Sequence, residues 1–390
     1  MEALRVLELY SGIGGMHYAL KGSSIPAEVV AAVDVNTTAN EVYKHNFSGT
    51  ALWPKTIEGI TLNDFNKLKF DMVLMSPPCQ PFTRIGLQGD VSDPRTKSFL
   101  YFLDILPRLN QLPKFILLEN VKGFETSSAR DALIRTLKEC GYKFQEFLIS
   151  PTCLGIPNSR LRYFLIAKAS PELFCFETTT EIMETFPSSH SAKATEVLDS
   201  VDRDFDGCRN GKLGSQPVHV GQGGNTVVFK LETARDLERK HRQDNDGSVE
   251  MLQSFLEESQ DFSQYLLPPK TLLRYAILMD IVRPTCRRSV CFTKGYGHYV
   301  EGTGSVLQTC LDTEIETAFR SLDMLSDEEK LKQLSMLKLR YFTPREIANL
   351  LGFPADFCFP EKTSTKQQYR LLGNSLNAHV VARLLKLLVA

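Results

Sequence analysis

Short apolar segments alternate with helix-length amphipathic segments over residues 4–168, and this alternation constrains the fold more than any other feature of the sequence. The apolar, β-branched segments predict strands over 4–9, 29–33, 71–75, 114–118 and 163–167. The amphipathic segments predict helices over 37–45, 98–109 and 129–140. Because strands separated by helices form parallel sheets with helices on both faces, we expect a doubly wound, Rossmann-like α/β fold with a mostly parallel sheet.

The rest of the chain predicts a second, smaller domain that precedes a C-terminal helix. Residues 178–224 are rich in Thr, Ser, Asp, Gly and Asn, so we expect a flexible insertion there. Helical spacing returns over 231–242 and 249–257, and a last helix over 377–388 has an apolar stripe wide enough to dock on the first domain. We therefore expect one domain from residues 1–170 with 365–390, and another from residues 171–364.

Charge and cysteine content exclude several classes of protein. The 45 Lys and Arg residues nearly balance 46 Asp and Glu residues, so the net charge gives no hint of nucleic acid. Nine cysteines without a C-x-x-C pair argue against a disulfide framework and against a structural zinc site, and they indicate a reducing compartment. No metal site is expected. The first residues lack a signal-peptide pattern and the apolar end is interrupted by Arg383 and Lys386, so we expect neither secretion nor a membrane span.

One segment of the second domain is strongly basic and aromatic. The eighteen residues 283–300 lack Asp and Glu but contain Arg283, Arg287, Arg288 and Lys294. The same segment contains four aromatic side chains, Phe292, Tyr296, His298 and Tyr299. Basic and aromatic side chains together are typical of nucleic-acid contacts, and a solvated surface is the alternative interpretation.

A glycine-rich turn follows the first expected strand, in the run Tyr-Ser-Gly-Ile-Gly-Gly over 10–15, and Asp34 ends the second strand. Glycines let the backbone approach a ligand closely, and a carboxylate on the second strand can accept both hydroxyls of a ribose. A dinucleotide fingerprint needs a small residue where this chain has His17. The mismatch favours an adenosyl ligand without phosphates, commonly S-adenosylmethionine, over NAD. A plain tight turn remains the third interpretation.

Three prolines, Pro77, Pro78 and Pro81, surround Cys79 just after the expected strand 71–75. Proline restricts both itself and the preceding residue, so this loop is stiff, and it lies at the end of a strand where open α/β sheets bind ligands. A thiol held in this way is typical of a nucleophile, whereas an inert buried cysteine is the alternative.

Three further polar motifs occur at expected strand or helix ends. Glu119 ends what we expect to be a central strand, where a charge needs either a salt-bridge partner or a function. Arg160 and Arg162 open a strand and point to the same face, so together they can clamp a carboxylate, a phosphate or a base carbonyl; ordinary surface arginines are the alternative. A Gly-Asn-Ser turn at 373–375 precedes the last helix.

These motifs, in this order, resemble those of the cytosine-5 methyltransferase family. The resemblance covers the first 168 residues and about the last fifty, and Cys291-Phe292-Thr293 is similar to a motif of the tRNA-directed subgroup. Many DNA-directed members have Phe, Glu and Gln where this chain has Tyr10, Asp34 and Asn158. The replacements keep the ring, the carboxylate and the amide.

The resemblance implies a class I S-adenosylmethionine-dependent methyltransferase fold with a target-recognition domain. It implies that Cys79 adds to carbon 6 of cytosine, which makes carbon 5 nucleophilic, and that Glu119 holds and protonates ring nitrogen 3. In the same way Arg162 steadies the base carbonyl and Arg160 orients the loop. Cofactor contacts carry over to Ile13, Gly14, Gly15, Asp34, Ile57, Glu58, Ser76, Asn374 and Ser375. We expect RNA contacts from Arg84, Arg287, Arg288, Cys291, Phe292, Thr293 and Lys294.

The expected function is methylation of carbon 5 of cytosine in tRNA. Resemblance to the tRNA-directed subgroup implies cytosine 38 in the anticodon loop of aspartate tRNA as the target, in a reaction of EC class 2.1.1. Three alternatives stay open: a DNA cytosine-5 methyltransferase, an NAD-dependent oxidoreductase, and a non-catalytic RNA-binding relative. We expect a monomer that binds tRNA, binds DNA only weakly and does not bind membranes. We expect it in the cytoplasm, with the nucleus left open.

Overall fold

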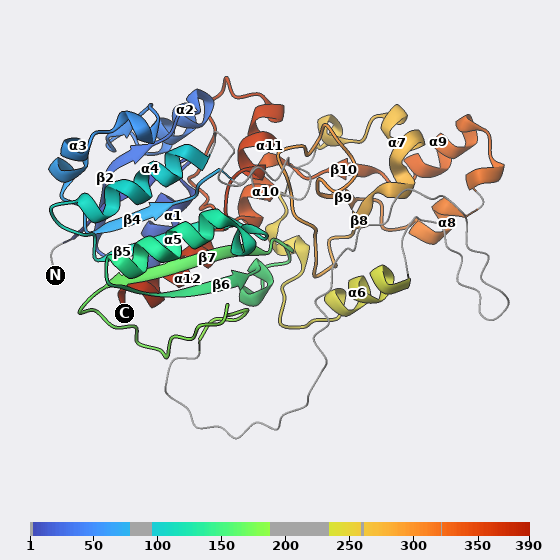
Figure 1. Ribbon diagram of the computed structural model, residues 1–390. Helices are drawn as coiled ribbons and strands as arrows, with labels where there is room; N and C mark the ends of the chain where they lie inside the picture. Colours follow the sequence, from blue (N-terminus) through green and yellow to red (C-terminus); the bar gives the residue numbers. More distant parts are fainter. Residues whose placement is uncertain (1–2, 79–95, 188–233, 259–260, 321) are drawn as a thin grey trace, which may run out of the picture.

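The computed structural model of the chain describes residues 3–78, 96–187, 234–258, 261–320 and 322–390. The candidate nucleophile Cys79, the candidate RNA contact Arg84 and most of the expected insertion 178–224 lie outside these residues. The described residues form a larger sheet and a smaller sheet, each with its own helices (Figure 1).

The larger sheet has seven strands in the order β3-β2-β1-β4-β5-β7-β6. The strands are β1 Leu4–Leu9, β2 Ala27–Val33, β3 Leu52–Trp53, β4 Met72–Met75, β5 Phe115–Val121, β6 Tyr142–Ile149 and β7 Arg162–Ala169. All neighbouring pairs are parallel except those that β7 makes with β5 and β6. The expected mostly parallel sheet is confirmed. Its strand order reverses between β1 and β4, and open α/β sheets bind ligands at the carboxyl ends of strands at such a point.

Helices cover both faces of the larger sheet (Figure 1). One face carries α1 Gly15–Ser23, α2 Thr37–Asn46 and α12 Ala378–Val389. The other carries α3 Leu62–Leu68, α4 Lys97–Ile105 and α5 Ser128–Glu139. Side chains alternate between the two cores along β1, where Val6 belongs to the first core and Leu7 to the second. The expected C-terminal helix is confirmed, and it packs against α1.

The smaller sheet has the strand order β10-β9-β8, with β8 parallel and β10 antiparallel to β9. Its strands are β8 Asp280–Val282, β9 Ser305–Gln308 and β10 Leu339–Tyr341. The helices of this part are α6 Ala234–Asp244, α7 Pro269–Tyr275, α8 Ile315–Phe319 and α9 Asp327–Ser335. α10 Pro344–Leu350 and α11 Thr365–Gly373 contact each other and lie between the two sheets (Figure 1).

The expected helix over 249–257 is wrong. This segment forms only a short 3-10 turn at Leu252–Phe255. The backbone N–H of Leu252 donates to the Cys286 carbonyl, and that of Gln253 donates to the Pro284 carbonyl. These two N–H groups are bonded to a segment more than thirty residues away along the chain, so they are not available to a helix.

None of the described helices is both long enough and apolar enough to cross a membrane. The seven cysteines that the structure describes are all free. Within the described ranges, no three His, Cys, Asp or Glu side chains are grouped as a metal site would require.

Candidate active site

The glycine turn and Asp34 lie together at the point where the strand order of the larger sheet reverses. The Gly12 N–H donates to one carboxylate oxygen of Asp34 at 2.8 Å, and the Asn36 N–H donates to the other at 2.7 Å. Gly14 has a φ of 88°, and a Cβ at this position would overlap the Phe47 ring. A side chain is therefore excluded here, and Asp34 is held oriented beside the backbone of the turn.

Candidate cofactor residues from other segments lie beside this turn. The Ser76 hydroxyl, directly after β4, donates to the Tyr10 carbonyl at 3.2 Å. The Ser375 hydroxyl lies 3.1 Å from the position that a Cβ of Gly15 would occupy. Ile57 is buried and Glu58 is exposed, in a 3-10 turn after β3, and Asn374 is exposed. The structure thus brings the first, second and last motifs of the sequence to one edge of the sheet.

A network of buried polar side chains supports the turn. The sequence motifs did not predict this network. The Tyr43 hydroxyl donates to Glu8 at 2.8 Å and lies 2.9 Å from Nδ1 of His17, whose ring stacks on Phe47 with 3.8 Å between centroids. Burial raises the pKa of Glu8 to about 8 and lowers the pKa of His17 to about 4. His17, noted in the sequence only as a mismatch to the dinucleotide fingerprint, is therefore a neutral packing residue beneath the turn.

The candidate proton donor Glu119 lies at the end of β5 and faces Arg162 at the start of β7. Oε1 of Glu119 is 3.5 Å from Nε of Arg162. Burial raises the pKa of Glu119 above its ordinary value, and the opposing effects of Arg162 and Arg160 do not cancel this rise. The next residue, Asn120, donates to the Pro77 carbonyl at 3.2 Å, two positions before Cys79. Glu119 is thus fixed next to the segment that leads to the candidate nucleophile, and its raised pKa favours the protonated form.

The buried side chain of Arg160 joins two distant motifs. Its guanidinium donates to the Phe292 carbonyl at 3.0 Å, to the Gly373 carbonyl at 3.2 Å and to the Ser375 carbonyl. Its Nη1 also lies 3.3 Å from Sγ of Cys291. Arg160 therefore links the Cys-Phe-Thr segment to the Gly-Asn-Ser turn that flanks the candidate cofactor site.

The thiol of Cys291 lies against both candidate catalytic arginines. Nη2 of Arg162 is 3.6 Å from Sγ, close to the distance from Arg160. Burial acts to raise the pKa of Cys291, but the two guanidiniums outweigh it and lower the pKa below its ordinary value. The two arginines, expected to point to the same face, both reach the Cys291 thiol, and Cys291 belongs to the same cluster as Glu119.

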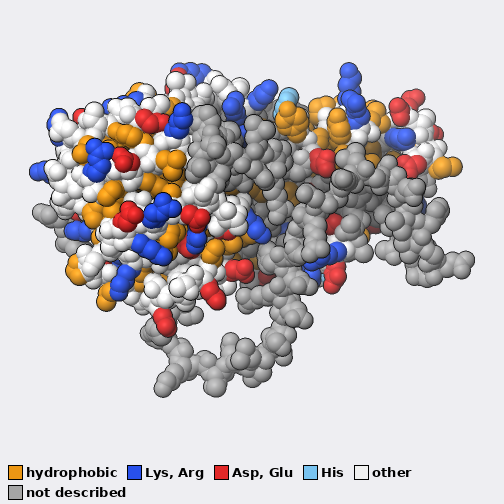
Figure 2. Space-filling model, viewed as in Figure 1, with side chains coloured by type: hydrophobic (Ala, Val, Ile, Leu, Met, Phe, Trp, Pro, Cys, Tyr) orange, Lys and Arg blue, Asp and Glu red, His pale blue; other side chains and the backbone are white. Residues whose placement is uncertain are grey.

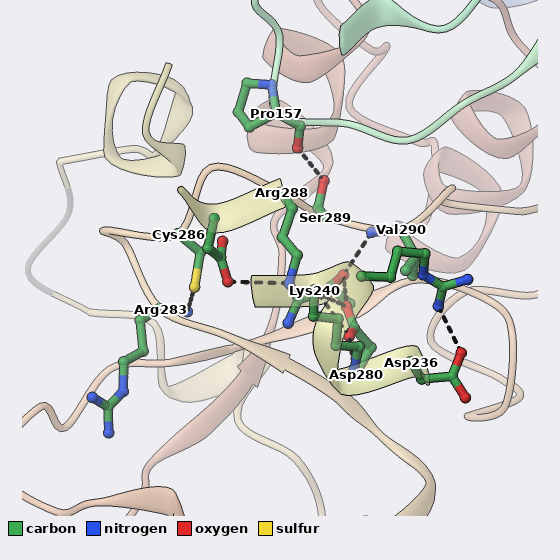
Figure 3. Close-up of polar contacts among 12 residues, drawn as sticks. Pro157, Asp236, Lys240, Asp280, Arg283, Cys286, Arg288, Ser289 and Val290 are labelled. Atoms are coloured by element: carbon green, nitrogen blue, oxygen red, sulfur yellow. Dashed lines mark hydrogen bonds and ion pairs between the residues drawn. The ribbon is translucent and has the colours of Figure 1, made fainter. Parts of the chain in front are cut away.

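Two of the expected RNA contacts have buried side chains in the structure. Arg288 is only 6% exposed and lies 2.8 Å from Asp280, which also binds Lys240 at 2.6 Å (Figure 3). Phe292 is 2% exposed and packs in the core. A phosphate could reach neither side chain without displacing these contacts.

The other candidate RNA contacts in the basic segment 283–300 differ in how exposed their side chains are. Arg287 is half-buried and donates to the Val249 carbonyl. Lys294 is exposed, and Thr293 lies between buried Phe292 and Lys294. Their RNA contacts stay predictions.

We expect Arg288→Ala to lower the free energy of unfolding by about 1.5–3 kcal/mol, because it removes a charge-assisted hydrogen bond from the buried Asp280 carboxylate, which keeps Lys240 and Ser305 as partners. Urea unfolding measures the change. Arg283→Ala is the control, because its ion-pair partner Glu314 is largely exposed and such pairs contribute about 0–1 kcal/mol. Equal unfolding midpoints for the two variants would contradict a structural role of Arg288.

Comparisons with known proteins identify the relatives of this chain. A family model described as C-5 cytosine-specific DNA methylase matches residues 4–390. Proteins named tRNA (cytosine(38)-C(5))-methyltransferase from Bos taurus and Homo sapiens are 63% and 62% identical in sequence to this chain. Each match covers 100% of both chains. A crystal structure of a Spodoptera frugiperda DNMT2 mutant has a TM-score of 0.77 at 39% identity, and the match covers 100% of both chains.

Proposed function

Because this chain belongs to the C-5 cytosine-specific methylase family, we propose that it transfers a methyl group to carbon 5 of cytosine 38 in tRNA. The observation that carries the proposal is the full-length similarity to relatives with this name, together with Glu119, Arg162 and Cys291 in one cluster. The family overturns the alternative of an NAD-dependent oxidoreductase.

The residues at the glycine turn fit S-adenosylmethionine. Asp34 is oriented by two backbone N–H groups and still has free acceptor capacity for ribose hydroxyls. Among the described residues, the buried Ser11 hydroxyl has no hydrogen-bond partner, so a polar ligand group would satisfy it. The cofactor, when bound, supplies an electrophilic methyl group. Ser76 and Ser375 flank the position that we assign to its amino-acid end.

The chain's own residues prepare the cytosine for this transfer. Cys79 adds as a thiolate to carbon 6, and Glu119 gives its proton to ring nitrogen 3, which neutralises the charge that addition places on the ring. The guanidinium of Arg162 lies beside Glu119, where it keeps the carboxyl group oriented toward the base. After methylation carbon 5 loses its proton to solvent, Cys79 is eliminated as a thiolate, and ring nitrogen 3 returns its proton to Glu119. The target must be extruded or unpaired for this attack, which an RNA loop allows at lower cost than a duplex.

We expect Asp34→Ala to weaken binding of S-adenosylmethionine by about 10- to 100-fold, because hydrogen bonds to a charged group contribute about 1.5–3 kcal/mol. Isothermal titration calorimetry with S-adenosylmethionine measures the loss. Glu28→Ala is a matched control, since Glu28 is an exposed carboxylate on β2, the strand that Asp34 directly follows. If both variants bind as the wild type does, the ribose contact assigned to Asp34 is wrong.

The function itself is tested by incubating the protein with a labelled methyl donor and either total tRNA or duplex DNA. Sequencing of the modified cytosine then identifies its position. We expect label in tRNA at cytosine 38. Label in DNA alone would replace this proposal by the DNA methyltransferase alternative, and an unaltered rate with Cys79→Ala would contradict the covalent mechanism.

A further inference from the structure

The segment 293–303 leaves the candidate active site and returns to it. The Thr293 N–H donates to the Thr303 carbonyl at 2.9 Å, which closes the segment into a loop. Two residues before this closure, Cys291 contacts Arg160 and Arg162. The base of the 293–303 loop is therefore attached to the cluster that contains Glu119.

Buried side chains fix the conformation of this loop. Tyr296 is 3% exposed; its hydroxyl donates to the Ser305 carbonyl at 2.7 Å and accepts from the Phe342 N–H at 2.9 Å. A Cβ at Gly297 would lie 3.0 Å from the ring of Tyr369 in α11, so the loop lies directly on that helix. The inner side of the loop is therefore anchored by hydrogen bonds and by a close backbone contact.

The tip of the same loop exposes two aromatic rings. Tyr299 is 64% exposed and the adjacent His298 is also exposed, with 4.6 Å between their ring centroids. The Tyr299 backbone is held by its N–H to Gly295 and by the Thr303 hydroxyl, at 2.9 and 2.7 Å. The rings thus gain little from burial in the folded chain, yet the backbone beneath them is ordered.

Exposed basic side chains occur on the same loop and on helix α11, which the loop contacts at Gly297. Lys294 on the loop is exposed, and Lys366 and Arg370 are exposed on α11, three positions before and one position after Tyr369. One acidic residue, Glu301, is also exposed at the tip. Figure 2 shows Lys and Arg side chains spread over the visible face among hydrophobic and acidic ones. Aromatic faces with nearby cations are the combination that binds unstacked nucleobases and their phosphates.

We propose that the exposed Tyr299 ring, against which His298 packs with 69° between the ring planes, is a stacking platform for a nucleobase next to the target cytosine in the RNA loop. This inference rests on the proposed function. Extrusion of the target base removes stacking from its neighbours, and an aromatic face close to the active site replaces the lost contact. The loop is held in place relative to the catalytic cluster. The Thr293 backbone packs against Gly373, and Cys291 contacts Arg160.

The test compares Tyr299→Ala, Tyr299→Phe and the matched control Tyr275→Ala, which removes a partly exposed tyrosine from α7. Binding of an anticodon stem-loop RNA is measured by fluorescence anisotropy, and KM and kcat are measured for methylation of tRNA. We expect Tyr299→Ala to raise both the Kd and KM about tenfold with kcat unchanged, and Tyr299→Phe to behave as the wild type does. The salt dependence of binding should be unchanged in Tyr299→Ala and weaker in Arg370→Ala, because stacking involves no counterion release.

Two readouts separate the platform from the proposed function. If the wild type binds the RNA through Tyr299 but methylates no tRNA, the proposed function fails, and the place of the platform beside a target cytosine fails with it, while the contact of Tyr299 with RNA is supported. If the wild type methylates tRNA and Tyr299→Ala matches Tyr275→Ala in Kd and KM, the platform is overturned. Absence of RNA binding by the wild type would overturn both.

Discussion

Glu119→Gln should lower kcat for methyl transfer by about 10²–10⁴-fold while the protein remains folded, because the amide keeps the size of the side chain but cannot give a proton to the base. Burial raises the pKa of Glu119, so at any given pH a larger fraction of its carboxyl group is protonated than in an ordinary glutamate. Activity of the wild type that depends on this proton should fall as the pH rises through the raised pKa. The pH dependence of kcat, measured for both proteins, tests the assignment.

Two controls make this result specific. Binding of S-adenosylmethionine should be unchanged in Glu119→Gln, since Glu119 contacts Arg162 and not the glycine turn. Cys79→Ala provides the reference for complete loss of covalent catalysis. A Glu119→Gln protein that keeps both the wild-type rate and its alkaline decline in activity would show that another group protonates the base.

The sequence predicts the larger sheet well where strands are apolar and poorly where they are polar. β1 has the expected bounds, but β5 extends past the expected end at residue 118, because Glu119 and Asn120 pair with Phe164 and Tyr163 of β7. β6 was missed altogether, since its polar residues suggest an exposed segment. Two of them, Gln145 and Glu146, are in fact buried and bind partners from other segments.

Those partners explain why the hydrophobic pattern of β6 does not predict a strand. Gln145 accepts from the Thr179 N–H and donates to the Glu181 carbonyl, and Glu146 receives two hydrogen bonds from Arg130. Buried polar side chains are stable when they are hydrogen-bonded, but the partners are not adjacent in sequence. Hydrophobic alternation alone therefore cannot identify such a strand.

The candidate site shows the same difference between residues placed by a local motif, which the sequence predicts, and residues placed by partners far along the chain, which it does not. Motifs at strand ends located Asp34, Glu119 and Arg162, because the carboxyl ends of parallel strands meet at one edge of the sheet and the antiparallel strand β7 begins at that same edge. The basic composition of residues 283–300 suggests an exposed Arg288. The acidic residues that pair with Arg288, Asp244 and Asp280, lie outside this segment of the sequence. A charge pattern counts neighbours along the chain, whereas burial depends on neighbours in space.

Gly373→Ala should lower both the stability of the fold and the rate of methyl transfer, although it adds only one methyl group. A Cβ at this last residue of α11 would overlap the backbone of Thr293 and Lys294, which cannot move aside as the end of a side chain can. Such overpacking costs about 1–3 kcal/mol, and here it also pushes on the segment that holds Cys291. We expect a lower midpoint of urea unfolding and a loss of methyl transfer of at least about tenfold.

The activity loss follows from the contacts of Arg160, which bridges the two backbones that the new methyl group would separate. Its guanidinium binds the carbonyls of Phe292 on one side and of Gly373 and Ser375 on the other. Displacing either side strains the position of Ser375 next to Gly15 and that of Cys291 next to Arg162. Gly49→Ala is the matched control, since a Cβ at Gly49 meets nothing within 4 Å. Gly373→Ala with the stability and rate of Gly49→Ala would show that this close approach does not hold the two motifs together.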